Sequence, residues 1–591
     1  MSLNQYQTDV LVVGGGGAGF RAAIGAREKG ARTILLSKGP LARCGATPMA
    51  GADFTLDGKN LKALGHNGDP NDSYEKVFND IVTQGFYLNN QKLIDQYIRT
   101  APQCLKELID WGVKITFSEQ RAIFTTGLGI MDALLKQARS LGVELLEDTM
   151  LLDLVTESGR VTGALGLDIK NGQFLHFQTK AVVMATGGWH KAFWPNTGMR
   201  DLSGEGIAAA HRAGADIGNM EFITFCCNVF YDPPIWRGSI APYILGLMAG
   251  HRLTNAWGEN FLDQYDPYVV KVGSGMEWNK AFISLASMKE VRAGKGGPNN
   301  GIFFSRGDVP WEKMQLVSQM MFPNWKYKAI DLTEWGRKLE ADEPVEVGPA
   351  VEYFDGGIMV NERFETTLAG LFAAGECSLG VFGANRVFSA ITEMLVHGAD
   401  AGRNAGGYAL ETGETQPDPA VFSAGEEKAL APLSRPKGPR PAEVRRRVQE
   451  TAHRMLGPVR NEKELESFLG FLQQIKKEEL PRLAVSTRTR TYNKEWIDAL
   501  ELSNIVFLLE AAARSALFRT ESRGVHYRED FPYTDNDNWL KESLVRRVNG
   551  QLKIETRPAT FTSVTPPRGV TPYLDMLKKL MQAHSDVGGH H

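Results

Sequence analysis

Cysteine, excess charge of one sign and long apolar runs are all scarce in this chain. Five cysteines in 591 residues are too few for a disulfide framework. The net charge of -3 indicates no basic surface for nucleic acid. No apolar run has the roughly 20 residues that a membrane-spanning helix needs. The first strand pattern begins almost at the N-terminus and leaves no room for a signal peptide. We therefore expect a cytoplasmic protein with reduced thiols, no direct membrane span and no nucleic-acid partner.

Metal-ligand spacing is also missing from the sequence. Cys226 and Cys227 are adjacent, which is not a chelating spacing for an iron–sulfur cluster. His590 and His591 are interpreted as a free tail. We predict no metal site. With 43% hydrophobic residues, a chain of this length can bury several cores and should divide into several domains.

A strand pattern near the N-terminus runs directly into a glycine-rich turn. Residues 8–13 are mostly apolar, residues 20–24 continue as a helix pattern, and Gly14, Gly16 and Gly19 lie between them. In a dinucleotide fingerprint, these glycines form the tight turn, admit the pyrophosphate and let the helix pack on the strand. The phosphates then lie at the positive end of the helix. This context favours a bound dinucleotide over an ordinary glycine-rich loop.

The second half of the fingerprint departs from the pattern. The next strand ends in Ser37-Lys38, where a carboxylate for the ribose is expected. Two later segments are informative: residues 181–188, which end in Thr186-Gly187-Gly188, and residues 370–377, which contain Glu376. Both resemble the second and third FAD-contact strands of two-dinucleotide-fold flavoproteins.

Several motifs, in order along nearly the whole chain, resemble the flavoprotein subunit of the succinate dehydrogenase and fumarate reductase family. Ser37-Lys38 is common there after the second strand, and residues 83–90 and 101–112 match its helical insertion. Gly383-Ala384-Asn385-Arg386 matches its Gly-Ala-Asn-Arg signature. Residues 514–528 and 537–540 match its C-terminal domain.

The resemblance implies an α/β fold with a discontinuous two-dinucleotide-type FAD-binding domain. We expect its two parts at residues 1–221 and 345–412, with a loop-rich capping domain at 222–344 between them. A proline-rich stretch at 413–441 predicts an extended linker, because prolines recur at 417, 419, 432, 436, 439 and 441. Helical periodicity at 442–542 predicts a helical domain, and residues 543–591 are expected to form an extended tail with a short strand pattern.

The resemblance also indicates which residues contact FAD. In the family, a histidine often carries FAD covalently, and Gly45 stands at that position here, so we predict noncovalent FAD. Cys44 falls on a neighbouring serine and is interpreted as a buried small residue rather than a flavin-linked thiol. The expected FAD-contacting residues are Gly14, Gly16, Gly19, Ser37, Lys38, Cys44, Gly45, Ala46, Gly51, Gly187, Glu205, Glu376, Arg386 and Ser389.

The substrate site departs from the fumarate reductase pattern. Fumarate reductases clamp both substrate carboxylates and supply a proton through an arginine. The His-Pro-Thr segment of the family aligns with Cys226-Cys227-Asn228, and the arginine aligns near Leu247. Phe382 replaces one histidine, and another is lost within residues 352–358. Only Arg386 of the clamp remains. A dicarboxylate buried with one cation would be poorly compensated, at a cost of several kcal/mol as an order of magnitude. Ordinary succinate or fumarate chemistry is therefore not expected.

Several residues could replace the lost groups. His251 and Arg252 lie close to the lost arginine and could donate a proton or hold an anion, although a surface pair on a cap loop is the simpler interpretation. Cys226 could be a reactive thiol or, more commonly, a buried inert one. Aromatic residues around the expected site suggest a larger, less charged or flat substrate: Trp189, Phe193, Trp194, Phe225, Phe230, Tyr231, Trp236, Phe382 and Phe388.

Two classes of function remain open at this point. The first is an FAD-dependent oxidoreductase that exchanges electrons between a small-molecule substrate and an iron–sulfur protein subunit, with association to a membrane only through partners. Its substrate would be another enoate, an acyl-CoA or a sulfur compound, as in adenylylsulfate reductase. The second is a non-catalytic flavin subunit that relays electrons within a larger complex. Arg386 and the full-length cap favour the enzyme, whereas the loss of the histidines favours the relay.

Overall fold

The computed structural model describes residues 4–50, 53–275, 278–321, 331–386 and 388–584. Its central layer is a seven-stranded sheet in the order β6-β2-β1-β9-β8-β7, with β16 paired to β9. Strands β6, β2, β1, β9 and β16 are parallel, whereas β7 and β8 pair antiparallel with their neighbours. Their bounds are β1 Gln5–Val13, β2 Thr33–Leu36, β6 Glu144–Leu146, β7 Thr149–Glu157, β8 Arg160–Asp168, β9 Gln173–Met184 and β16 Leu371–Ala373.

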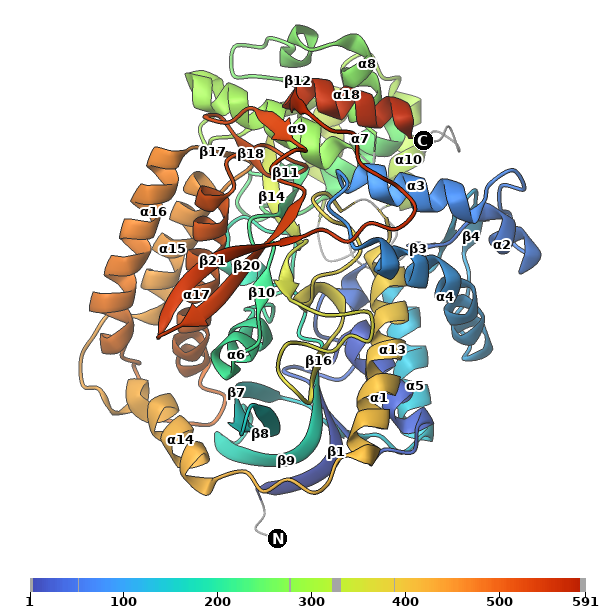
Figure 1. The fold of residues 1–591 in the computed structure, drawn as a ribbon. Helices are drawn as coiled ribbons and strands as arrows, with labels where there is room; N and C mark the ends of the chain where they lie inside the picture. The colour runs from blue at the N-terminus through green and yellow to red at the C-terminus, as the bar shows by residue number, and fades with distance from the viewer. Residues whose placement is uncertain (1–3, 51–52, 276–277, 322–330, 387, 585–591) are drawn as a thin grey trace.

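Helices α1, α5 and α13 lie together beside this sheet (Figure 1). Helices α1 and α13 approach closely because α13 presents a row of glycines. A Cβ added at Gly398, Gly402 or Gly406 would lie 2.6, 2.0 or 3.1 Å from the carbonyl oxygens of Ala18, Ala22 and Ala26. The small side chains on both helices therefore fix their spacing. The bounds are α1 Gly17–Glu28, α5 Gly127–Ser140 and α13 Ala390–Glu411.

Where we expected a helical insertion, the chain forms α3 (Tyr74–Gln84) and α4 (Gln91–Asp110). Short elements precede and follow it: β3 (Asp53–Thr55), α2 (Gly58–Ala63), β4 (Phe117–Glu119) and β5 (Ala122–Phe124). Helix α6 (Glu205–Ala213) follows β9 in the chain and leads to the region predicted as the cap.

The region predicted as a loop-rich cap is more regular than the sequence suggested. A sheet in the order β11-β14-β13-β12 carries helices on the chain between its strands. Strand β14 pairs with β11 and β13, so this sheet continues past residue 345, where we expected the FAD-binding domain to resume. The bounds are β11 Ile223–Phe230, α7 Ala241–Ala249, β12 Arg252–Thr254, α8 Pro267–Gly273, α9 Asn279–Glu290, β13 Ile302–Ser305, α10 Trp311–Met321, α12 Thr333–Glu340 and β14 Val345–Phe354.

The extended linker predicted at 413–441 is wrong over most of its length, because helix α14 occupies Pro419–Ser434. Asp418 caps this helix through its carboxylate, which accepts a hydrogen bond of 2.8 Å from the Ala420 amide. Pro419 and Pro441 stand at the starts of α14 and α15, where a missing N–H costs nothing. Two of the six prolines therefore mark helix starts, and Pro432 lies within α14.

Three helices lie in the first part of the region predicted to be helical: α15 (Pro441–Met455), α16 (Glu462–Gln474) and α17 (Lys494–Phe518). These helices form the left flank in Figure 1. Short strands accompany these helices. Strand β17 (Val459–Arg460), between α15 and α16, pairs with β18 (Tyr527–Arg528) after α17, and β19 (Tyr533–Asp535) pairs with β22 (Val570–Pro572).

The C-terminal segment is folded into the molecule rather than extended. Strands β20 (Lys541–Val548) and β21 (Gln551–Pro558) form a hairpin, and β20 pairs with β10 (Ile217–Gly218), which pairs with β15 (Gly357–Ile358). Helix α18 (Tyr573–Ala583) follows and lies beside the cap, close to α8 and α9 (Figure 1). The sequence pattern did not predict this helix. Its buried face carries Tyr573, Met576, Leu577, Leu580 and Met581.

Candidate functional site

The glycine-rich turn connects the end of β1 to the start of α1. Gly14 has a φ of +128°, and a Cβ there would lie 2.0 Å from the Ala185 carbonyl oxygen. A Cβ at Gly19 would lie 1.8 Å from the Gly14 carbonyl oxygen, so both positions require glycine. At Gly16, the residue that precedes α1, the nearest atom would be 3.8 Å away. The turn is therefore packed on the sheet side and open at the helix N-terminus, which fits a pyrophosphate.

Lys38, after β2, is held in a buried ionic cluster. Its Nζ lies 3.0 Å from Glu205 Oε1 and 2.7 Å from Glu501 Oε1, and it donates to Ser203 Oγ at 2.7 Å. Burial lowers the pKa of Lys38, but the two carboxylates more than offset this and raise it. The structure thus brings the predicted residues Lys38 and Glu205 together. It adds Glu501 from α17, which sequence reasoning missed because no local motif marks it.

The segment after β2 contains the expected noncovalent position. Gly45 has a φ of +77°, and its amide donates to Asp201 Oδ2 at 2.8 Å. The Cys44 Sγ lies 3.1 Å from Ser37 Oγ, and burial raises the pKa of this thiol. Ala46 precedes a short 3-10 turn at Thr47–Met49. Gly51 lies outside the described residues.

The second and third expected contact segments meet at Glu376. The Glu376 carboxylate accepts hydrogen bonds from the amides of Gly188 (3.2 Å) and Phe354 (3.3 Å), and burial raises its pKa. The neighbouring Gly187 has a φ of +68°. Ser389 caps α13, since its Oγ accepts a 3.3 Å hydrogen bond from the Thr392 amide and donates to the Asp53 carbonyl oxygen.

Arg386 is the centre of a mostly buried charged cluster. Its Nη1 lies 3.7 Å from Glu352 Oε2 on β14, and the same oxygen lies 2.7 Å from Lys280 Nζ on α9. The guanidinium also stacks on the Tyr353 ring, with 5.0 Å between the guanidinium carbon and the ring centroid. Burial lowers the pKa of Arg386, but surrounding carboxylates, Glu352 foremost, raise it above its ordinary value. We call Arg386, Glu352 and Lys280 the charged triad.

Sequence reasoning did not identify Lys280, and it noted Glu352 only as part of an altered segment. Lys280 is 7% exposed, although it lies on a cap helix. A lysine buried on a helix face gives no motif, so only the fold reveals its partner. Tyr243, on α7, lies beside the triad: burial and the Glu352 charge raise its pKa, while a hydrogen bond with Asn279 lowers it.

The structure separates His251 from Arg252. The His251 ring is buried against Phe304, with 5.0 Å between ring centroids, and its Nε2 lies 3.3 Å from Asn228 Nδ2. Burial lowers the pKa of His251 to about 4. Arg252 is half exposed and pairs with Asp342 at 3.3 Å. Among the described residues, no hydrogen bond or ion pair joins either side chain to the charged triad.

The cysteine pair on β11 is fully buried. Burial raises the pKa of Cys227 to about 12, although the Lys280 charge lowers it. The Cys227 thiol is therefore protonated near neutral pH, and for Cys226 the complete burial favours the inert interpretation.

Most of the expected aromatic residues form core contacts. The Trp189 ring stacks on Phe354 at 4.2 Å, and Phe193 meets Phe225 edge to face at 6.3 Å. Phe230 packs on Trp236 at 5.1 Å, whereas Trp194 is 43% exposed. Phe382 meets the ring of Tyr353 at 5.9 Å, which places it beside the charged triad.

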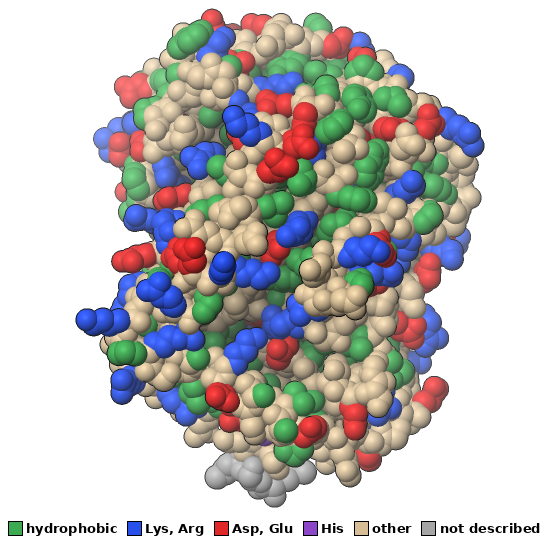
Figure 2. All heavy atoms as spheres, turned by 60° about the vertical axis from the view of Figure 1, so that its left-hand side comes forward, with side chains coloured by type: hydrophobic (Ala, Val, Ile, Leu, Met, Phe, Trp, Pro, Cys, Tyr) green, Lys and Arg blue, Asp and Glu red, His purple; other side chains and the backbone are tan. Residues whose placement is uncertain are grey.

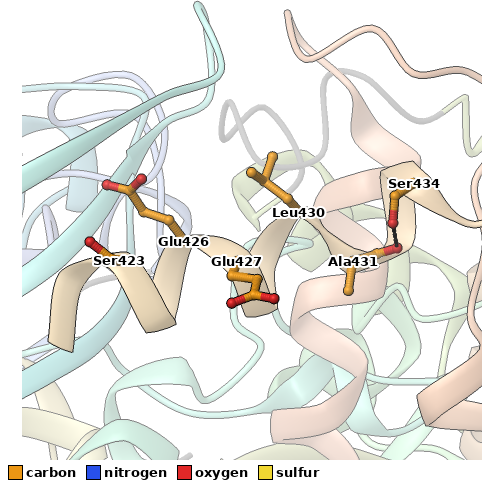
Figure 3. A pocket seen from close by; sticks show the side chains of 6 residues that line it. All are labelled: Ser423, Glu426, Glu427, Leu430, Ala431 and Ser434. Atoms are coloured by element: carbon orange, nitrogen blue, oxygen red, sulfur yellow. Dashed lines mark hydrogen bonds between the residues drawn. The ribbon is translucent and has the colours of Figure 1, made fainter. Parts of the chain in front are cut away.

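One face of the outer surface and a hollow on it can be compared with this interior site. On the face that carries α14 to α17, Lys and Arg mix with Asp and Glu (Figure 2). A hollow along α14 is drawn in Figure 3 and is lined by Ser423, Glu426, Glu427, Leu430, Ala431 and Ser434. These six side chains include no cation and no nucleophile other than serine. Within the described residues, we find neither a cluster of metal-ligating side chains nor a helix long and apolar enough to cross a membrane.

Comparison with known proteins agrees with this geometry. The FAD binding domain family matches residues 9–121 and 117–390, and the fumarate reductase flavoprotein C-terminal family matches residues 445–571. The chain is 30% identical over 565 residues to a subunit of the fumarate reductase (CoM/CoB) of Methanothermobacter marburgensis, covering 93% of this chain and 98% of the relative. It is 28% identical over 601 residues to the fumarate reductase flavoprotein subunit of Mycobacterium tuberculosis, covering 95% and 98%.

A solved structure has the same fold. "Mycobacterium smegmatis Sdh1 in complex with UQ1" aligns with a TM-score of 0.83 and 27% identity, over 95% of this chain and 96% of that one. The similarity therefore extends over the FAD region, the cap and the C-terminal domain together.

Proposed function

The chain belongs to the succinate dehydrogenase and fumarate reductase flavoprotein family, and from this premise we propose that it oxidises or reduces a substrate other than fumarate or succinate. Its membership makes it an FAD-dependent oxidoreductase. When bound, FAD supplies the hydride or electron transfer. Three features of the chain fit FAD: the open N-terminus of α1, the cluster around Lys38, and Glu376.

One observation carries the choice of substrate. Glu352 pairs with both cations of the site, Lys280 and Arg386. A site that binds a dicarboxylate would need these cations to be available to the substrate. A buried dianion would meet cations already paired with a carboxylate of the chain. Burying uncompensated charge costs several kcal/mol as an order of magnitude. The site therefore suits an enoate of lower charge, an acyl thioester or a sulfur compound.

The test is anaerobic mixing of the reduced protein with a panel of electron acceptors. The panel holds fumarate, monocarboxylic enoates, enoyl thioesters and adenylylsulfate, and reappearance of the oxidised flavin spectrum is the signal. We expect reoxidation by a member other than fumarate. Fumarate turnover on the order of 1 per second or faster would contradict the proposal.

The electron partner is proposed to be an iron–sulfur protein. The described residues hold no cluster of metal-ligating side chains, yet the chain retains the C-terminal domain of the fumarate reductase flavoproteins at 445–571. Purification from the native host followed by mass spectrometry and iron analysis tests this. A homomer without iron that reoxidises quickly in air would contradict it.

A second function is a flavin relay without a substrate. It is favoured by the same pairing of Glu352 with both cations, because a relay needs no free cation. No reoxidation by any acceptor in the panel, together with rapid electron exchange with an iron–sulfur partner, would support this alternative.

A further inference from the structure

We propose that Glu352 occupies the place of one substrate carboxylate, so that the charged triad binds a substrate with a single carboxylate, held by Lys280 and Arg386. This deepens the proposed function and rests on it. Lys280 and Glu352 thereby become substrate-binding and specificity-determining residues.

The charges of the triad carry the first step. Lys280 and Arg386 supply two positive charges, and Glu352 supplies one negative charge at 2.7 and 3.7 Å from them. One positive charge is left over within the triad. A monocarboxylate balances it, whereas a dicarboxylate leaves the buried group with an excess negative charge.

Other carboxylates around Arg386 do not restore a dianion site. Burial raises the pKa of Asp355 to about 8, so this group is mostly neutral at pH 7. Glu393 accepts hydrogen bonds from Tyr353 Oη (2.7 Å) and the Val381 amide (2.9 Å), which occupy both of its oxygens. Asp53 adds a further negative charge near Arg386. None of these groups adds a positive charge that a second substrate carboxylate could neutralise.

The geometry leaves a donor for the substrate. Among the residues that the structure describes, Arg386 Nε is buried and has no hydrogen-bond acceptor. A buried guanidinium N–H without a partner is costly and points to a ligand that supplies the acceptor. The side chains of Arg386 and Glu352 are each 18% exposed, so both retain some surface that a small ligand can contact.

The test compares two ligands of equal length, crotonate with one carboxylate and fumarate with two. Each is titrated into the oxidised FAD-loaded protein, and the perturbation of the flavin spectrum gives the Kd. We expect crotonate to bind wild type at least 10-fold more tightly than fumarate. Glu352→Gln removes the internal anion, so the preference should shift at least 10-fold toward fumarate.

Lys280→Gln should weaken crotonate binding at least 10-fold, whereas Lys280→Arg should retain binding within a few fold. Lys271→Gln, at an exposed lysine of the cap, is the matched control and should change neither Kd. The FAD content and the visible circular dichroism of each variant verify that it is folded.

Equal binding of the two ligands by wild type would overturn the proposal, as would an unchanged preference in Glu352→Gln. Absence of binding by either ligand in every variant would overturn it as well. These outcomes concern binding only. The proposed oxidoreductase function falls separately, if no acceptor reoxidises the reduced flavin.

Discussion

At the scale of single residues, Gly45 and Cys44 give a prediction about how FAD is attached. Gly45 has no nucleophile, and the buried Cys44 thiol has a raised pKa and contacts Ser37. We predict that acid precipitation releases all of the yellow colour into the supernatant. Cys44→Ser, the matched variant, should behave identically. Colour retained in the wild-type pellet but lost in Cys44→Ser would identify a flavin–cysteine bond.

Asp355 gives a pH-dependent prediction at the same scale. Its folded-state pKa of about 8 lies above the ordinary value of 3.8, because burial disfavours the anion more than the Thr224 hydrogen bond favours it. The neutral Asp355 carboxyl contributes its full stabilisation at pH values below the pKa of the unfolded chain. This stabilisation is lost as the pH rises toward 8. The loss in the free energy of unfolding is at most about 1.4 kcal/mol per unit of pKa difference.

Asp355→Asn does not ionise and avoids this loss. We expect the Tm difference between the variant and wild type to be more favourable to the variant at pH 8 than at pH 5. Glu119→Gln, at an exposed carboxylate of β4, serves as the control and should show no such trend. Equal differences at both pH values would show that Asp355 is ionised in the folded protein throughout.

At the scale of elements, the packing of α1 on α13 depends on where glycine stands. Gly402→Ala places a Cβ 2.0 Å from the Ala22 carbonyl oxygen, so the helices must separate. Overpacking of this kind costs roughly 1–3 kcal/mol. Gly407→Ala on the same helix meets nothing within 4 Å and should stabilise by up to about 1 kcal/mol through helix propensity.

Thermal unfolding of both variants checks this prediction. Because α1 also carries the glycine turn at its start, Gly402→Ala should lose FAD on gel filtration more readily than Gly407→Ala. If both substitutions shift Tm in the same direction by the same amount, the close approach of the helices does not limit stability.

At the scale of the whole molecule, helix α17 contacts the segment after β2, where we expect FAD to bind. Glu501 of α17 contacts Lys38, and it also pairs with Lys191, which lies 2.8 Å from Asp498 Oδ1. Glu501→Gln removes one carboxylate partner from Lys38 and Lys191, at a cost of about 1–3 kcal/mol. We predict roughly 10-fold weaker FAD binding, measured by titration of the apoprotein with FAD.

Glu510→Gln is the matched control, since Glu510 lies on the same helix but pairs outward with Lys476 and Arg514. Its FAD affinity should equal that of wild type. A double variant with Lys38→Met should lose less affinity than the two single losses added together, because both changes remove one interaction. Fully additive losses would place Glu501 outside the FAD region.

Sequence patterns predict those parts of this protein whose residues are neighbours in the chain. The glycine turn, the strand before it and the helix after it are contiguous, so their pattern predicts their geometry. Arg386 likewise belongs to the contiguous Gly-Ala-Asn-Arg signature. Local signals misled where one pattern serves two structures, as in residues 413–441, where Pro419 and Pro441 begin helices instead of extending the chain.

Tertiary structure alone decided which distant charges meet. Lys280 on α9, Glu352 on β14 and Arg386 before α13 come from three separate elements, as do Lys38 and Glu501 from two. The pairing of β20 with β10 likewise joins residues far apart in the chain. Such contacts leave no periodicity or spacing in the sequence, because a charge is attracted to whatever the fold brings near it. The cofactor could therefore be predicted from local motifs, whereas the charge of the substrate site is a property of the folded molecule.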